Sequence, residues 1–451
     1  MIPPRSCASP ILDAALLPWC DALAYFFLRS VKLLGPETAF SEQEFRKRLV
    51  RMVVEGMMPF SSVDLKTLRS AFNLLKPGVP IPSAKTLKSD LMKCFREEDD
   101  RINERLRCEC SKISVTLDCW TSPNNKAYLG VTGHYIDKNW ALQSLLLDFV
   151  PLSGPHTGEN MCGALVDVCK RRGILDKLLG VTSDNATNIG KLLTCLKGAF
   201  GKHGVAFSKD QQHVRCIAHV VNLAVQEFLG ELKAEDATVN PNPDCGVATQ
   251  TADESSIIKL RRVVRWIRSS PQRSELFGSM CKKCKVPKNK KAILDSPTRW
   301  NSTYFMIKRA IELREPLSLM MEAMKKELPG LSDSDWELLE VAGQVLGIFE
   351  EGTRWLCAAN YPTLNKAVCA YNHLLDELEN YLGQCNDEEE GREKAAIIDQ
   401  CGPANKRVLT AAMKAAHTKL RGYYADTWAG IYAVSLILDP STDTPGLGWH
   451  V

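Results

Sequence analysis

The sequence predicts an α/β protein with a mixed five-stranded sheet and flanking helices, set between a helical N-terminal region and a large all-α region. Apolar residues recur at helical spacing before residue 110, alternate with a period of two between 113 and 152, and return to helical spacing from 257. The central segment reads as three successive strands followed by helix–strand crossovers. That order favours a mixed sheet with helices on its faces.

The composition is that of a globular chain long enough for two or three domains, with 451 residues, 45% hydrophobic and 24% charged. It contains no run of about 18 apolar residues, so we expect no membrane span. Prolines and Asp13 interrupt the apolar N-terminus, which makes it a poor signal peptide. The 17 scattered Cys favour reduced intracellular thiols, with a disulfide scaffold as the weaker alternative.

Residues 1–110 are predicted to be a helical N-terminal region. Ser41 is a candidate N-cap with Glu44 at capping-box spacing, and Pro59 ends that helix. Pro77 ends a second helix, and Ser83 begins a third that runs to about residue 108.

Residues 111–230 are predicted to form the sheet and its helices. Thr157 and Gly173 fit the two ends of the first crossover helix. A polar linker follows at 231–256, then helices at 257–438 and an unstructured tail at 439–451. The five strand segments are "ISVTLDC", "AYLGVTGHYID", "WALQSLLLDFVPL", "LLGVTSD" and the short "QHVRCIA".

Two of these strands end on a carboxylate, at Asp118 and Asp184. The first and fourth strands of such a sheet are expected to be neighbours, which would bring the two side chains together. Carboxylate oxygens suit Mg²⁺ or Mn²⁺, and such metals can activate a water and stabilise a leaving oxygen in phosphodiester cleavage. The alternative is that both residues are ordinary turn or cap residues.

A C-x-x-H motif at Cys216 and His219 and a C-x-x-C at Cys281 and Cys284 are the metal-like spacings. We do not expect zinc, because the two motifs lie far apart in the chain. A buried thiol and a hydrogen-bonding histidine at a helix start explain Cys216 and His219 better.

The charge distribution is uneven. Residues 256–310 hold 15 Lys and Arg against two acidic residues, whereas the rest of the chain holds 42 against 51. This asymmetry favours a polyanion partner, although a solvated helix face is an alternative. Helical spacing places three arginines opposite the apolar face, and two lysines follow. These candidate phosphate contacts are Arg261, Arg265, Arg268, Lys282 and Lys283.

The lysine cluster could equally be a nuclear import signal, and a calmodulin-target or membrane-surface helix would look similar. Just beyond it, Arg299 and Trp300 stand side by side. An exposed Trp there could stack a flipped DNA base. The alternative is a core Trp beside a solvated Arg.

Several strings occur together in order: "LDCWTS", "YLGVTGHYID", "GVTSDNATNIG", "RCIAHVVNLAVQ" and "TRWNSTYFM". Over roughly residues 40–440 the chain resembles the hAT superfamily of transposases and their BED-finger relatives. The resemblance implies a ribonuclease-H-like core with a helical insertion, and metal-dependent DNA cleavage and strand transfer. Asp118 and Asp184 match the first two acids of the family's triad, Cys216 and His219 its C-x-x-H, and Arg299 and Trp300 its Arg-Trp pair.

The chain departs from the family pattern in two places. No BED zinc finger precedes residue 40, and the family's third acid and dimerisation region lie beyond the point where the family-like text ends, so we expect a truncated, catalytically impaired relative. DNA is the expected partner, along with a second copy or a full-length transposase relative, and the nucleus the expected location. We expect no small-molecule substrate. A non-catalytic regulator and a non-functional relic are the alternatives.

Overall fold

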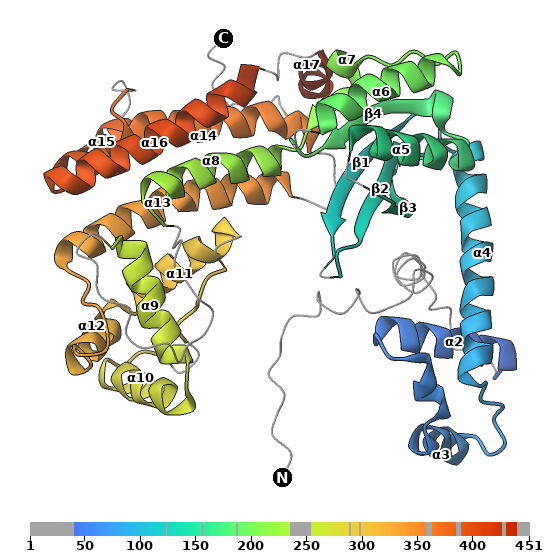
Figure 1. Ribbon diagram of the computed structural model, residues 1–451, viewed down its shortest axis with the longest axis horizontal. Coiled ribbons are helices and arrows are strands. Elements are labelled where there is room, and N and C mark those ends of the chain that lie inside the picture. The colour runs from blue at the N-terminus through green and yellow to red at the C-terminus, as the bar shows by residue number, and fades with distance from the viewer. Residues whose placement is uncertain are drawn as a thin grey trace. The chain divides into compact units, whose positions relative to one another are not determined.

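We describe the protein from a computed structural model, shown as a ribbon in Figure 1. The chain divides into two compact units, Met1–Arg215 and Cys216–Val451. Residues 1–39 of the predicted helical region lie outside the described residues, as do most of the predicted linker and tail. The described residues contain no helix long and apolar enough to cross a bilayer. They are 40–122, 124–154, 157–185, 188–234, 254–287, 290–296, 299–357, 363–384, 389–425 and 430–439.

Four helical segments begin the first unit. The side chains of Ser41 and Ser83 accept hydrogen bonds from backbone N–H groups three residues later, so both predicted N-caps are confirmed. Arg46 joins two of the helices through a bidentate ion pair with Asp90, beside a small core of buried Leu and Val side chains. The segments are α2 (Glu42–Glu55), the 3-10 helix η2 (Phe60–Asp64), α3 (Lys66–Leu75) and α4 (Ala84–Cys108).

A five-stranded mixed sheet follows, in the order β3-β2-β1-β4-β5. The pairs β1–β2 and β2–β3 are antiparallel, whereas β1–β4 and β4–β5 are parallel. The predicted fold class and the neighbouring of the first and fourth strands are therefore confirmed. The strands are β1 (Ile113–Thr121), β2 (Ala127–Ile136), β3 (Leu142–Leu152), β4 (Leu178–Ser183) and β5 (His213–Arg215).

Two longer helices, α5 (Gly158–Arg172) and α6 (Ile189–Gly201), connect β3 to β4 and β4 to β5. Both connections step across the sheet in the same direction, so right-handed crossovers place both helices on one face. Alternate residues of β1, including Ile113 and Val115, are fully buried in the core shared with these helices. The intervening residues of β1 occupy the opposite face, and Asp118 is among them.

A bulge in β3 is held by a buried arginine. The register of β2 and β3 shifts so that Val131 pairs with Asp148 and Thr132 with Leu146, which leaves Leu147 as the extra residue. Arg172 of α5 is 6% exposed, and its Nε and Nη2 donate to the carbonyl of Leu147 at 2.9 and 2.6 Å. This contact satisfies a carbonyl that lies buried beneath the helix.

The second unit is helical. The helices α8, α13, α14 and α16 lie side by side in Figure 1 and contact one another. The division after Arg215 assigns α8 to this unit, earlier than the predicted boundary at 230. The helices are α8 (Ile217–Glu231), α9 (Ser256–Arg268), α10 (Pro271–Lys283), α11 (Trp300–Glu312), α12 (Arg314–Ala323), α13 (Asp333–Leu356), α14 (Ala367–Tyr381), α15 (Glu389–Gln400), α16 (Pro403–Tyr424) and α17 (Gly430–Ile437). The short helices α7 (Lys209–Gln212), η3 (Leu175–Lys177) and η4 (Leu364–Lys366) complete the described elements.

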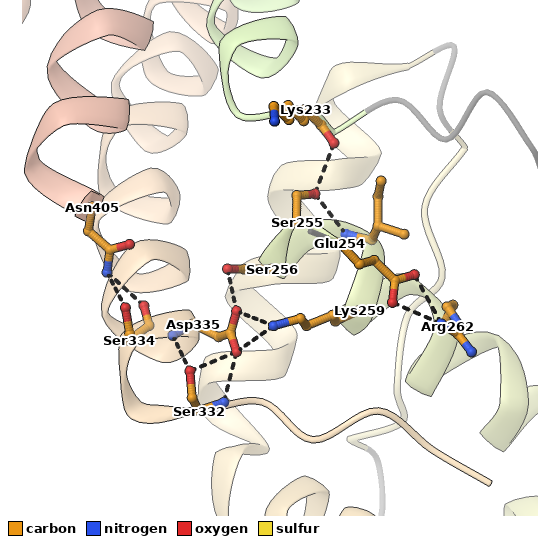
Figure 2. A network of polar contacts seen from close by, with 11 residues as sticks. Lys233, Glu254, Ser255, Ser256, Lys259, Arg262, Ser332, Ser334, Asp335 and Asn405 are labelled. Carbon is orange, nitrogen blue, oxygen red and sulfur yellow. Dashed lines mark hydrogen bonds and ion pairs between the residues drawn. The ribbon is translucent and has the colours of Figure 1, made fainter. Parts of the chain in front are cut away.

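Figure 2 shows the polar network that fixes α9 against α13. At its centre, Asp335 accepts hydrogen bonds from the Ser256 hydroxyl at 2.7 Å and from the Lys259 ammonium at 3.0 Å. The backbone N–H and the hydroxyl of Ser332 donate to the same carboxylate, and Ser332 caps α13 in return. One carboxylate therefore sets the position of the helix that carries the predicted DNA-binding arginines.

Candidate active site and basic surface

Two carboxylates lie at the same end of adjacent parallel strands. Thr116 of β1 pairs with Thr182 of β4, and an Asp follows two residues later on each strand. Asp118 is exposed, and Asp184 is half-buried just after β4 ends. Because parallel strands end at the same edge of a sheet, this register brings Asp118 and Asp184 to one place.

The thiol of Cys119 feels both carboxylates. Burial is the main reason that the pKa of Cys119 is raised, and the negative charges of Asp184 and Asp118 raise it further. A single half-buried thiol thus reports that the two acids converge. The sequence predicts this convergence from the order of the strands.

Polar side chains from β4 and β5 fix the backbone around Asp184. The buried Ser183 hydroxyl donates to the carbonyl of Asp184 at 3.1 Å and also bonds Nε2 of His213 at 3.0 Å. Since the hydroxyl has one proton, Nε2 of His213 is the donor in that second bond. Beside them, Arg215 donates from Nη1 to Oδ1 of Asn185 at 3.3 Å.

An aromatic cluster lies on the same face of the sheet as Asp118. Trp120 packs on Tyr128 and Phe149 with ring centroids 5.9 and 5.0 Å away, and it remains 38% exposed. Gly130 stands opposite Asp118, where a Cβ would come within 3.3 Å of the Trp120 ring. Sequence reasoning missed this cluster and the polar group around Asp184. The signal was the period of two, which places residues 118 and 120 on one face.

The donor set suits a small, hard cation. Mg²⁺ and Mn²⁺ accept one or two protein carboxylates and complete their shell with water and substrate phosphate. An exposed and a half-buried carboxylate at one sheet edge meet that requirement. The described residues contain no group of three or more His, Cys, Asp or Glu side chains placed to hold a metal.

Arg261 does not occupy the exposed face that its spacing predicts. It is 3% exposed, and its guanidinium forms a bidentate ion pair with Asp295 at 2.8 and 2.7 Å. Its Nη1 also donates to the carbonyl of Ala234 at 2.8 Å. The placement of Arg261 among surface phosphate contacts was therefore wrong, because a distant acid closes over it.

The other predicted basic contacts are accessible. Arg268, Lys282, Lys283 and Arg299 are exposed and Arg265 is half-buried, and none of the five forms an ion pair with a described residue. Other basic residues of the 256–310 segment are neutralised within the unit. These paired residues are Lys259, Arg261, Arg262, Arg273, Lys290 and Arg309.

Trp300 belongs to the core. It is 4% exposed and meets Phe349 of α13 edge to face, with centroids 6.5 Å apart. The exposed-base-stacker interpretation is wrong for this arrangement, and the alternative of a core Trp beside a solvated Arg is confirmed. Arg299 stands just before α11 and is exposed.

The C-x-x-H motif begins α8. Cys216 precedes the helix, and the backbone N–H of His219 donates to the carbonyl of Cys216 at 3.0 Å. Both side chains are half-buried. Cys357, at the end of α13, is close enough that the charge of Cys216 contributes to its raised pKa, after burial. The motif thus lies where two helices of the second unit meet.

The fold and the paired carboxylates define a ribonuclease-H-like protein that carries a helical unit. Residues 116–211 match the family model of the ZBED1 RNase-like domain, and residues 214–345 match that of the ZBED1 RNase-like helical domain. The join between the two matches coincides with the division of the chain into two units. The chain belongs to the hAT family of transposase-like proteins.

The relatives include a putative transcriptional regulator, tpeD, of Talaromyces stipitatus, which is 29% identical over 76% of this chain and 41% of its own length. The putative AC transposase of Zea mays is 25% identical over 77% and 41%. The zinc finger BED domain-containing protein RICESLEEPER 2 of Oryza sativa subsp. japonica is 23% identical over 72% and 43%. The chain spans about two fifths of the length of these relatives.

Proposed function

We propose that this transposase-derived protein binds DNA and carries a metal-dependent centre for DNA cleavage and strand transfer. One observation carries the proposal: two carboxylates end adjacent parallel strands in a ribonuclease-H-like sheet. The basic residues of the helical unit that lack ion pairs supply the attraction for phosphates.

Asp118 and Asp184 are the residues that would hold Mg²⁺ or Mn²⁺. When bound, such an ion activates a water and stabilises the leaving oxygen of a phosphodiester. The chain's own contribution is to hold the carboxylates in place. Ser183 and His213 fix the backbone of Asp184, and the strand pairing of β1 fixes Asp118. We propose that cleavage is slow, since two carboxylates leave most of the metal's shell to water.

The test is a nicking assay with the purified chain, Mn²⁺ and a supercoiled plasmid carrying the ends of an hAT element. We expect weak nicking that falls below detection in Asp118→Asn and Asp184→Asn. Asp167→Asn, on the exposed face of α5, is the matched control and should nick like the wild type. Equal nicking in all four proteins would assign the activity to a contaminant and refute the proposal.

A second candidate is a non-catalytic nuclear DNA-binding regulator. The similarity to a protein named as a putative transcriptional regulator favours it. In that case DNA binding survives Asp118→Asn and no nicking is seen with any metal. Under both candidates Arg268→Ala, Lys282→Ala and Lys283→Ala each flatten the salt dependence of DNA binding, by about 0.9 in the log–log slope for each phosphate that is no longer neutralised. An unchanged slope in all three would move the DNA-binding surface elsewhere.

We also propose a nuclear location and association with a second copy or with a longer transposase relative. The exposed Lys282 and Lys283 support import, since short lysine clusters can serve as import signals. A fluorescent fusion of the chain should accumulate in nuclei and redistribute on Lys282→Ala/Lys283→Ala. Light scattering on the purified chain at several concentrations would reveal self-association.

A further inference from the structure

The side-chain amide of Asn185 is oriented by its neighbour. Its Oδ1 accepts a hydrogen bond from Nη1 of Arg215 at 3.3 Å. A guanidinium can only donate, so the amide oxygen must face Arg215 and the NH₂ group must point away from it. The amide is therefore held in one of its two flip states by an arginine on the next strand.

The NH₂ group of Asn185 is buried and has no hydrogen-bond partner among the described residues. A buried donor left unpaired costs free energy, so native structures rarely keep one without a reason. Asn185 directly follows Asp184 at the sheet edge where the two carboxylates converge. An unsatisfied donor thus lies next to the proposed metal ligands.

The chemistry of this donor selects its ligand. An amide nitrogen does not coordinate Mg²⁺ or Mn²⁺, and the amide oxygen is occupied by Arg215, so Asn185 is not a metal ligand. The nearby carboxylates are acceptors and repel a phosphate unless a cation and a donor offset them. A neutral N–H donor can contact a phosphate oxygen without competing with the carboxylates for the metal.

We propose that Nδ2 of Asn185 donates to a non-bridging oxygen of the DNA phosphodiester that reaches Asp118 and Asp184. Arg215 is a positioning residue that acts through Asn185 by fixing its flip state. This subsite rests on the proposed function, because it requires that DNA enter the carboxylate site.

The test measures binding of the full chain to a short DNA duplex in Mn²⁺, with and without one methylphosphonate at the cleavage position. Asn185→Ala removes the donor, and we expect about tenfold weaker binding, as for loss of a hydrogen bond to a charged acceptor. Asn185→Asp keeps the shape and the Arg215 contact but replaces the donor with an acceptor, so binding should weaken further. The methylphosphonate should weaken the wild type and leave Asn185→Ala unchanged.

Three further measurements separate this subsite from other roles. Mn²⁺ affinity in the absence of DNA should be the same in Asn185→Ala and the wild type. The melting temperature should not fall in Asn185→Ala, since the variant removes an unsatisfied donor. Asn139→Asp, in an exposed turn at the opposite end of the sheet, makes the same charge change and should bind DNA like the wild type.

Wild-type DNA affinity in Asn185→Ala would overturn the subsite and leave the proposed function standing, as expected if only a water occupies the donor. A lower melting temperature in that variant would also overturn it, by showing a structural role. A wild type that binds no DNA at low salt would overturn both proposals together.

Discussion

Arg261 and Asp295 form an ion pair inside the helical unit, with side-chain exposures of 4% and 0% and an Nη2–Oδ2 distance of 2.7 Å. Thr303 donates to the same carboxylate at 2.9 Å. The pair joins α9 to the segment before α11 and removes one arginine from the surface. Its partner lies far along the chain, so no helical spacing could reveal it.

Arg261→Ala should lower the free energy of unfolding by about 3–5 kcal/mol, because it leaves Asp295 buried without its partner. It should not alter the salt dependence of DNA binding beyond what misfolding explains. Arg268→Ala is the contrast: it should leave stability within about 0.5 kcal/mol and flatten the salt slope. Urea denaturation and binding titrations at several salt concentrations would check both. A flattened slope in folded Arg261→Ala would contradict the burial argument.

Asp335 should make the helical unit sensitive to acid. Burial opposes its ionisation and is the largest effect, but hydrogen bonds from Ser256, Ser332 and Lys259 outweigh it, so the pKa is lowered. A carboxyl with a lowered folded pKa stabilises the fold fully above its ordinary pKa of about 3.9, and loses that contribution as the pH falls through the folded value.

Asp335→Asn should therefore destabilise the protein by about 2–4 kcal/mol near neutral pH, with the difference from the wild type shrinking below about pH 4. Urea denaturation of both proteins from pH 7 to 3 gives the two curves. Asp333→Asn, on a fully exposed neighbour, should track the wild type at every pH. A constant difference at all pH values would mean that the carboxylate charge is irrelevant.

Arg172 should be needed for the bulge in β3. Arg172→Leu leaves the carbonyl of Leu147 buried and unpaired, so we expect a loss of about 2–4 kcal/mol in unfolding free energy. The adjacent Arg171 is largely exposed at its side chain, and Arg171→Leu should cost less than about 1 kcal/mol. Equal effects of the two substitutions would show that the bulge does not depend on Arg172.

The strands and both acids were predictable because their signals are local. A period of two fixes which residues of β1 face the core, and the order of strands alone makes β1 and β4 neighbours. The helical unit was harder. Six of the residues of α9 are buried hydrophobic or arginine side chains, a wider arc than the predicted apolar stripe, because several other elements cover that helix. Arg261 falls within that arc.

Trp300 shows the same limit. The letters "RW" are compatible with a surface stacker or a core residue, and only Phe349, on a different helix, decides between them. In the same way α8 follows the last strand directly, but it packs against α16, far along the sequence. The orientation of Asn185 was equally hidden, since it depends on Arg215 from the next strand.

The two tryptophans of the predicted motifs should behave oppositely. Trp300→Ala removes a buried side chain and should cost about 3–5 kcal/mol. Trp120 keeps 38% of its surface exposed, so Trp120→Ala should cost clearly less. Urea denaturation gives both values. If Trp300→Ala were the milder of the two, the assignment of Trp300 to the core would be wrong.

The start of α5 lies close against the start of α6, next to the segment that follows Asp184. A Cβ on Gly158 would come within 2.5 Å of both the carbonyl of Asn188 and the backbone N of Leu192, so Gly158→Ala must push the two helices apart. We expect a loss of about 1–3 kcal/mol in stability and weaker Mn²⁺ binding, because the backbone that carries Asp184 shifts. Gly163→Ala, in the same helix with open space around it, should be neutral or stabilise by up to about 1 kcal/mol. If Gly158→Ala bound Mn²⁺ as tightly as Gly163→Ala, the helix contact would not control the carboxylate site.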